Sequence, residues 1–262
     1  MLDVKELSVT AKNGQELLHQ ITLQIEVGQA VGLTGQSGAG KTTLLKALLG
    51  ILGNGCKVSE GDVLVDEQPL WKLNTRKRRE LCGTTLGFIP QNPMTAFDAR
   101  LKIKFQISET LRLKIGLPRE QAMEQAKNLL SELGLPQPER VLDSYPAQLS
   151  GGMLQRVTAA LLLALNPKYI LADEPTSALD AENRELLLHL LQKQKEKTGI
   201  LFISHDVEAL CTLCSKVHVM EHGQLTEEGT MQELLFHPQR EWTKQYAAAN
   251  KKVSKEGWLW KD

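Results

Sequence analysis

A glycine-rich octapeptide near the N-terminus limits what this chain can fold into more than any other feature. Residues 35–42 read G-Q-S-G-A-G-K-T and match the pattern G-x-x-x-x-G-K-[ST]. A short apolar segment precedes them, and a helical pattern from about residue 41 to 49 follows. Small residues at a strand-to-helix turn let backbone N–H groups surround a phosphate, and the helix N-terminus adds a favourable dipole. The segment therefore predicts an α/β sheet with a phosphate cradle after one strand.

Two side chains of this segment have specific expected roles. Lys41 supplies a mobile cation for the β- and γ-phosphates of a nucleotide, and Thr42 offers a hydroxyl to Mg²⁺. We therefore predict ATP and Mg²⁺ as cofactors. The alternative, an incidental glycine turn, is disfavoured by the strand before it and the helix after it. The residues expected to contact the nucleotide here are Gly35, Gln36, Ser37, Gly38, Ala39, Gly40, Lys41, Thr42 and Thr43.

A second segment ends in two adjacent carboxylates. Residues 169–174 read Y-I-L-A-D-E, which is typical of a buried strand that delivers its last side chains to the sheet edge. Asp173 can hold a metal ion through water, and Glu174 can polarise an attacking water as general base. Taken by itself, the segment is equally compatible with a strand end that happens to be acidic.

A third segment, residues 149–156, reads L-S-G-G-M-L-Q-R and precedes an apolar helix that stops at Pro167. A serine followed by two glycines at a helix N-terminus makes a second anion-binding turn. Because one nucleotide needs only one such cradle, the second turn indicates a nucleotide shared between two copies. The simpler interpretation is that Ser150 only caps the helix.

The remaining pattern predicts strands and helices in alternation. Strands are expected at residues 2–9, 21–27, 30–34, 62–66, 86–90, 169–172 and 200–204, with a hairpin at 217–229. Helical periodicity dominates from about residue 100 to residue 143, which we interpret as an insertion, and returns at 182–195 and in a polar tail from residue 231. Such alternation favours a parallel sheet covered on both faces.

Composition excludes several other classes of protein. The 262 residues contain 31 basic and 31 acidic side chains, so the chain has no electrostatic footprint for nucleic acid or an anionic membrane. The longest apolar run, residues 159–165, is too short to span a bilayer, and the N-terminus does not resemble a signal peptide. We therefore expect a cytosolic chain whose membrane role depends on partners.

Six motifs in order resemble those of the ABC transporter ATPases, and the resemblance covers nearly the whole chain. Besides the three segments above, Gln91 in F-I-P-Q matches the glutamine loop, Asp180 in S-A-L-D the D-loop, and His205 in I-S-H-D the switch histidine. The resemblance implies a P-loop (RecA-like) parallel sheet core with an antiparallel β subdomain and an inserted α-helical subdomain. It places the nucleotide-binding core at 1–91 and 161–262 and the helical signature subdomain at 92–160.

The resemblance also implies roles for residues. Glu174, His205 and Gln91 would be catalytic, and Thr42, Gln91 and Asp173 would hold the metal ion. Two nucleotide-binding domains would pair head to tail, so that the signature of one contacts the ATP of the other. The nucleotide contacts expected from the signature and the D-loop are Ser150, Gly151, Gly152, Gln155 and Asp180.

Partners follow from the same resemblance. They are a second ABC ATPase subunit, identical or different, two transmembrane permease subunits and, indirectly, a solute-binding protein, with no nucleic acid. The chain would lie at the cytoplasmic face of the inner membrane as a peripheral subunit. A soluble ABC ATPase in a non-transport complex is the alternative; it is less favoured because such proteins commonly fuse two cassettes or carry coiled-coil insertions.

Residues 91–98, Q-N-P-M-T-A-F-D, resemble the glutamine loop of the peptide and nickel importer branch, and residues 237–243 a diverged form of its C-terminal motif. Within that branch the chain is most similar to nickel-import subunits, while nickel, another chelated metal and short peptides stay open as cargo. Cys211, Cys214, His218 and His222 have metal-binding side chains but spacings shorter than in zinc sites, so we expect no metal there. Trp258 and Trp260 are expected to pack as part of the tail.

Overall fold

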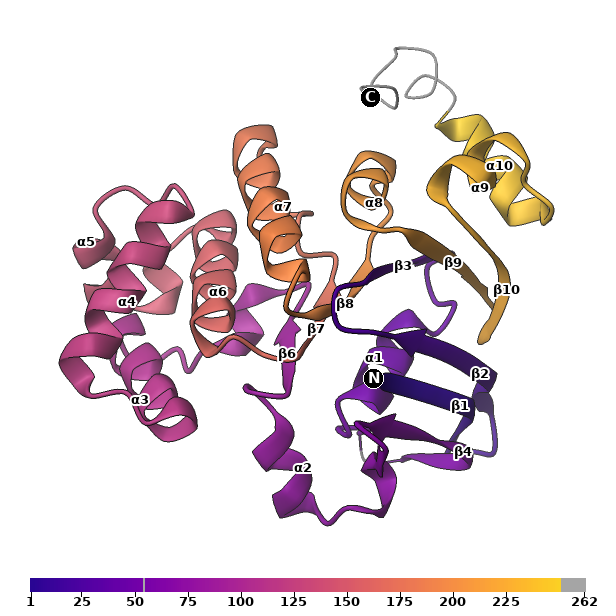
Figure 1. Cartoon of the computed structure of the whole chain (residues 1–262), viewed down its shortest axis with the longest axis horizontal. Helices are drawn as coiled ribbons and strands as arrows, with labels where there is room; N and C mark the ends of the chain where they lie inside the picture. Colours follow the sequence, from indigo (N-terminus) through magenta and orange to yellow (C-terminus); the bar gives the residue numbers. More distant parts are fainter. Residues whose placement is uncertain (54, 251–262) are drawn as a thin grey trace. The chain divides into compact units, whose positions relative to one another are not determined.

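The computed structural model describes residues 1–53 and 55–250, and the chain divides into two compact units (Figure 1). One unit contains residues 1–80 and the chain from residue 199 onward, and the other contains residues 81–198. Trp258 and Trp260 lie outside the described residues. Each unit is described by itself below.

The first unit contains an antiparallel sheet in the order β2-β1-β4-β5. Its strands are β1 (Leu2–Ala11), β2 (Glu16–Ile25), β4 (Cys56–Val65) and β5 (Gln68–Pro69). The antiparallel subdomain is confirmed, but the bounds predicted for β2 and β4 were wrong. Strand β2 begins earlier because Thr10 already pairs with Glu16 across a tight hairpin. Strand β4 is longer because it pairs with the whole of β1, from Leu2 opposite Val65 to Ala11 opposite Cys56.

The same unit holds the strands around the glycine-rich turn. Strand β3 (Ala30–Gly35) lies between β8 (Gly199–Ile203) and β9 (Lys216–Glu221) and runs parallel to both, while β10 (Gln224–Gly229) is antiparallel to β9. All residues of β3 and β8 are buried, as a parallel sheet with both faces covered requires. The predicted buried strands and the hairpin are confirmed.

Helices complete the first unit. Helix α1 (Lys41–Leu48) follows the glycine-rich turn, and α8 (Val207–Leu213) follows β8. The predicted polar tail forms two helices, α9 (Met231–Phe236) and α10 (Glu241–Ala249), which lie beside β9 and β10 in Figure 1. Pro238 falls between the two helices, where its missing N–H and fixed φ interrupt helical pairing. The pattern did not predict η1 (Leu70–Lys72) or α2 (Thr75–Leu81).

The second unit contains two parallel strands and most of the long helices. Strands β6 (Leu86–Ile89) and β7 (Tyr169–Asp173) pair in register, with Ile89 opposite Ala172. A Cβ at Gly87 would lie 2.3 Å from the Leu162 side chain, so only glycine lets β6 approach the helix that bears Leu162. The helices are α3 (Ile103–Ile115), α4 (Arg119–Glu132), α5 (Pro138–Asp143), α6 (Gly151–Leu165) and α7 (Ala181–Lys195), with short turns η2 (Pro93–Ala96) and η3 (Pro146–Gln148).

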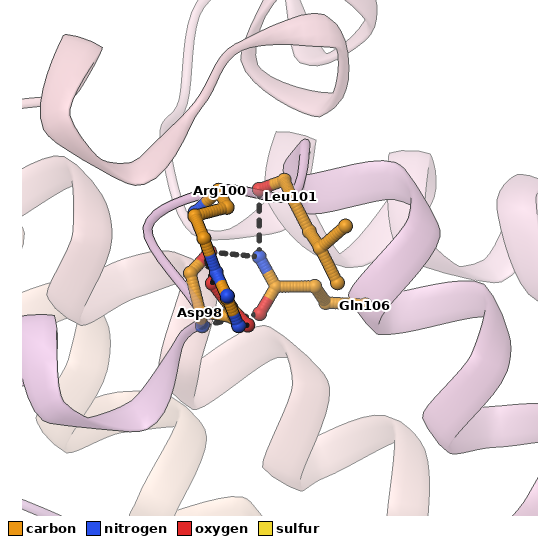
Figure 2. A network of polar contacts seen from close by, with 4 residues as sticks. All are labelled: Asp98, Arg100, Leu101 and Gln106. Atoms are coloured by element: carbon orange, nitrogen blue, oxygen red, sulfur yellow. Dashed lines mark hydrogen bonds and ion pairs between the residues drawn. The ribbon is translucent and has the colours of Figure 1, made fainter.

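The first long helix of the insertion begins at Ile103, close to the predicted start at about residue 100, and side chains hold the loop before it (Figure 2). Gln106 accepts a hydrogen bond from the Asp98 N–H at 2.7 Å and donates to the carbonyls of Asp98 and Leu101 at 3.0 and 2.8 Å. The Asp98 carboxylate accepts from the backbone and guanidinium of Arg100, which lowers the pKa of Asp98 to about 2. These bonds satisfy backbone groups that a longer helix would otherwise use.

Candidate functional site

The glycine-rich turn is a strand-to-helix connection that depends on two missing side chains. Strand β3 ends at Gly35 and α1 begins at Lys41. A Cβ at Gly35 would lie 2.1 Å from the carbonyl oxygen of Met220 on β9, and Gly35 has φ +145°. Gly40 adopts φ +109°, and a Cβ there would lie 3.2 Å from the Leu17 carbonyl. Both positions therefore require glycine, which produces the open backbone turn predicted from the sequence.

Lys41 folds back over this turn. Its ammonium donates hydrogen bonds to the carbonyl oxygens of Gly35 at 2.5 Å and Gln36 at 2.9 Å. The side chain thus holds its charge above the loop, where phosphate oxygens could take the place of these carbonyls. Gln36, Ser37, Gly38 and Thr42 are exposed, and Lys41 and Thr43 are half-buried, so the cradle is accessible.

A second contact fixes the loop from outside. The β9–β10 hairpin turns at Gly223, whose N–H donates to the Ala39 carbonyl at 2.8 Å. A Cβ at Gly223 would lie 2.6 Å from the Leu17 carbonyl, so this turn also needs glycine. The sequence predicted the hairpin around Gly223 but gave no signal that its tip would hold the phosphate loop.

His205 lies in the same unit, directly after β8. The N–H of Ser204 donates to the Leu33 carbonyl on β3 at 3.2 Å, which ties the end of β8 to the strand that leads into the loop. The His205 residue as a whole is exposed, but its surroundings remove part of the solvation of the imidazole. Partial burial and, second, the charge of Lys41 lower the pKa of His205. The ring is therefore neutral at physiological pH and can both donate and accept a hydrogen bond.

A cavity of about 440 Å³ lies in the first unit at the end of β1. Ala11 ends that strand opposite Cys56 of β4, and the two lysines, Lys12 and Lys57, flank the opening. None of the residues that line the cavity is aromatic; they are Thr10, Ala11, Lys12, Gly14, Gly55, Cys56 and Lys57.

In the second unit, the parallel pairing of β6 and β7 brings two predicted residues to one edge. Asp173 ends β7 and is 7% exposed, and Gln91 follows β6 two residues after Ile89 and is exposed. Because Ile89 pairs with Ala172, both strands end at the same edge of the pair. The oxygen atoms of a carboxylate and an amide are hard ligands of the kind that Mg²⁺ prefers.

Glu174 follows Asp173 in an uncommon backbone conformation. Its φ is +46°, the left-handed region that costs energy for a residue with a side chain. A turn supports it, because the N–H and the hydroxyl of Ser177 donate to the Glu174 carbonyl at 3.2 and 2.9 Å. Backbone outliers that are supported in this way cluster at functional sites.

The signature segment forms the N-terminus of α6. The Ser150 hydroxyl accepts a hydrogen bond from the Met153 N–H at 3.2 Å, so the simpler interpretation of Ser150 as a helix cap is correct for the local geometry. A Cβ at Gly151 would meet open space, whereas one at Gly152 would lie 3.0 Å from the Ala178 carbonyl. The helix start is therefore accessible at Ser150 and Gly151 and packs closely against the D-loop at Gly152.

Arg156 joins the signature helix to the D-loop, a role that the sequence analysis missed. Its guanidinium donates to the carbonyls of Leu133 and Gly134 at 3.2 and 2.9 Å and to the Asn183 side chain at 2.7 Å. Asn183 donates in turn to Asp180, the N-cap residue of α7, and its backbone and side-chain bonds lower the pKa of Asp180. The position of Arg156 within a strongly apolar helix could have indicated this role, because a buried guanidinium requires hydrogen-bond partners.

Gln155, which was predicted to contact the nucleotide, is 1% exposed in this unit. Its amide donates to the Pro90 carbonyl at 3.4 Å, directly before Gln91. The structure therefore places Gln155 beneath the glutamine loop and within the interior of the unit.

Cys211, Cys214, His218 and His222 form the cluster of metal-binding side chain types at which we expect no metal. Within residues 1–53 and 55–250, no group of three or more His, Cys, Asp or Glu side chains is arranged to hold a metal ion. His218 is buried on β9, and burial lowers its pKa to about 4 despite the Glu228 carboxylate 3.3 Å away. Burial likewise raises the pKa of Cys211 to about 11, so its thiol is protonated and a poor ligand.

Comparisons with known proteins agree with these motifs. A family model described as ABC transporter matches residues 18–177. The chain is 36% identical to the dipeptide transport ATP-binding protein of Haemophilus influenzae over 93% of this chain and 75% of that one. It is 33% identical to the metal-staphylopine import system ATP-binding protein of Staphylococcus aureus over 97% and 94% of the two chains.

The chain is also similar to a solved structure, a dimeric ATP-binding cassette in a post-hydrolysis state bound to ADP and phosphate. The TM-score is 0.79 at 28% sequence identity, and the match covers 88% of this chain and 99% of that one. This likeness confirms the predicted fold class, a parallel sheet core with an antiparallel subdomain. No helix within the described ranges is long and apolar enough to cross a membrane. The chain belongs to the ABC transporter family and is an ATP-binding subunit that hydrolyses ATP.

Proposed function

We propose that this subunit powers uptake of a short peptide or a metal chelate through a membrane permease. Support comes from the extent of the match, because relatives named for dipeptide transport and metal-staphylopine import align with 93% and 97% of this chain. The observation that favours the proposal most is the second of these alignments, which spans nearly the whole of both proteins. Nickel as the specific cargo rests on the sequence likenesses of residues 48–52 and 149–156 to nickel-import subunits.

The phosphate cradle would hold the ATP phosphates through the backbone of residues 35–43 and the ammonium of Lys41. Glu174 would accept a proton from the attacking water, and the neutral His205 imidazole would hydrogen-bond the γ-phosphate. Gln91, just after the end of β6, would sense the metal ion and the attacking water. Because binding and positioning supply much of the barrier reduction in phosphoryl transfer, small displacements of these groups should affect turnover strongly.

The residues proposed to hold Mg²⁺ are Thr42, Gln91 and Asp173. Their hydroxyl, amide and carboxylate oxygens fit a small hard cation, and Asp173 is buried at the end of β7. When bound, the ion would neutralise charge on the phosphate oxygens. The chain's own contribution is to fix these oxygens at the start of α1, for Thr42, and at the ends of β6 and β7, for Gln91 and Asp173.

Two ATPase subunits would share each nucleotide. The exposed helix start at Ser150 and Gly151 offers backbone N–H groups to the γ-phosphate of the ATP bound by the partner subunit. Asp180 of the D-loop would contribute a further contact to that nucleotide. The partner can be a second copy or a related ATPase, beneath two permease subunits that receive cargo from a solute-binding protein. We infer a peripheral location at the cytoplasmic face of the inner membrane, with the nucleotide core at 1–91 and 161–262 and the signature subdomain at 92–160.

The alternative is an ABC ATPase that works without a permease. Co-expression with candidate permease subunits, followed by sedimentation of membranes, distinguishes the two functions. The proposal predicts that the chain enters the membrane fraction only when the permease is present, and that the purified complex has ATPase activity stimulated by its loaded solute-binding protein. A chain that stays in the supernatant with the permease present would support the alternative.

Replacing Glu174 by Gln should leave ATP binding intact and reduce hydrolysis by on the order of 10²-fold or more, because the general base is removed while the phosphate cradle is unchanged. Lys41→Ala is the contrasting variant, which should weaken nucleotide binding itself because it removes ground-state phosphate contacts. Binding is measured with a fluorescent ATP analogue and hydrolysis by phosphate release. Wild-type turnover in Glu174→Gln would remove Glu174 from the role of base.

The cavity beside Ala11 is proposed to receive the nucleobase, in a family whose members commonly stack adenine on an aromatic side chain there. Stacking one base on an aromatic ring contributes roughly 1–3 kcal/mol, so its absence should leave poor base discrimination. We expect ATP and GTP to be hydrolysed within roughly tenfold of each other. Ala11→Tyr should tighten ATP binding, while Ala11→Leu adds apolar volume without a ring and serves as control. A preference for ATP of about a hundredfold in the wild type would contradict this account.

A further inference from the structure

The C-terminal helix α10 contacts the histidine loop through one side chain. The hydroxyl of Tyr246 donates a hydrogen bond to the main-chain carbonyl of His205 at 3.0 Å, across 41 residues of sequence. We propose that Tyr246 is a positioning residue for ATP hydrolysis, which holds the peptide after His205 and thereby sets the direction of the imidazole. The inference rests on the proposed role of His205 toward the γ-phosphate.

The peptide unit between His205 and Asp206 is held at both of its polar groups. On one side, the Asp206 N–H donates to the Ser204 hydroxyl at 3.0 Å. On the other side, the His205 carbonyl accepts from Tyr246. Because a peptide unit is planar, fixing both groups fixes the ψ angle of His205, and the direction of its Cα–Cβ bond follows. Removing the Tyr246 hydroxyl would release the carbonyl side of this peptide from α10 and leave the local bond from Asp206 to Ser204 in place.

The loop on either side of that peptide is fixed independently. Ser204 is bonded to the Leu33 carbonyl on β3, and the Asp206 carboxylate caps α8 by accepting from the N–H groups of Glu208 and Ala209 at 3.0 and 3.2 Å. These contacts belong to the sheet and to the helix cap, and they do not involve α10. Removing the Tyr246 hydroxyl should therefore change the orientation of His205 without unfolding the loop.

Tyr246 is itself well supported. Its ring stacks on Trp242, one helical turn earlier, with centroids 5.0 Å apart and an interplanar angle of 15°. The Asn250 side chain donates to the Tyr246 carbonyl at 2.8 Å, one turn later. A half-buried, stacked ring presents its hydroxyl in one direction, so little conformational freedom is lost when the bond to His205 forms.

Helix α10 is anchored to the hairpin that holds the phosphate loop. The Glu227 carboxylate on β10 accepts from the N–H groups of Gln239 and Arg240 at 2.8 and 3.1 Å, just before the helix begins. The tip of the same hairpin holds the Ala39 carbonyl through Gly223. The hairpin therefore holds the phosphate loop through Gly223 at its tip and the start of α10 through Glu227 on β10. Helix α10 lies beside this hairpin in Figure 1.

A purely structural role for Tyr246, in docking α10, makes a different prediction from positioning. Loss of docking would lower the unfolding midpoint or ATP affinity, whereas loss of positioning would lower kcat alone. Tyr246→Phe separates the two because it keeps the stacked ring and removes only the hydroxyl. Gln245→Ala is the matched control, since it removes a hydrogen bond to Glu241 on the same helix that does not reach the histidine loop.

The test is steady-state hydrolysis by the intact complex purified with its permease, together with thermal unfolding. For Tyr246→Phe we expect kcat to fall about three- to tenfold, the range set by one hydrogen bond, with KM for ATP within about twofold and the midpoint unchanged. Gln245→Ala should match the wild type in all three measurements. Wild-type kcat in Tyr246→Phe, or a parallel loss of ATP affinity or stability, would overturn the proposed positioning role.

His205→Ala, measured beside these variants, separates this inference from the function on which it rests. Loss of turnover in His205→Ala with wild-type turnover in Tyr246→Phe would overturn the role of Tyr246 alone. Wild-type turnover in His205→Ala would overturn the proposed role of His205 and, with it, the inference about Tyr246. Loss in both variants, with the kcat-only signature in Tyr246→Phe, is the expected result.

Discussion

The close approach of two parallel strands at Gly35 is the constraint on which the nucleotide-binding unit depends. No residue with a side chain fits there, since a Cβ would lie 2.1 Å from the Met220 carbonyl. This approach lets β3 end beside β9, so that the chain leaves the sheet, turns through glycines and starts α1 at Lys41. The β9–β10 hairpin then continues to Gly223, which holds the Ala39 carbonyl. The phosphate loop is therefore built between a strand end and a hairpin tip.

The functional polar groups of each unit likewise occur at strand ends and helix starts. Parallel pairing of β6 with β7 brings Asp173 and the glutamine loop to one edge, and the helix start at Ser150 lies against the D-loop at Gly152. Backbone groups at these ends lack partners within their own element and are available for anions or for capping side chains. Asp180 and Asp206 are such caps, each at the start of a helix that follows a predicted motif.

The sequence predicts those parts of the fold in which a residue pattern is compatible with only one kind of local structure. Glycines in a G-x-x-x-x-G-K-T segment and buried strands such as β3 and β7 are of this kind, and their bounds were close. The conformation of the loop before α3 could not be predicted, because Gln106 reaches backward to bond the loop at Asp98, and periodicity carries no information about that contact. Gln155 shows the same limit in the site: its motif predicted a nucleotide contact, while the structure buries it against Pro90.

Sharing of one nucleotide between two subunits is the central claim of the account, and Ser150 tests it most directly. Ser150→Arg fills the exposed helix start, and Ser150→Asn is the control because its side chain still caps α6 without added charge. The measurement is ATP binding by the isolated chain alongside hydrolysis by the assembled complex. We predict that Ser150→Arg binds ATP as the wild type does but loses hydrolysis by at least about tenfold, while Ser150→Asn retains most of it. Equal loss of ATP binding by the isolated chain would place this turn at its own nucleotide and contradict the shared site.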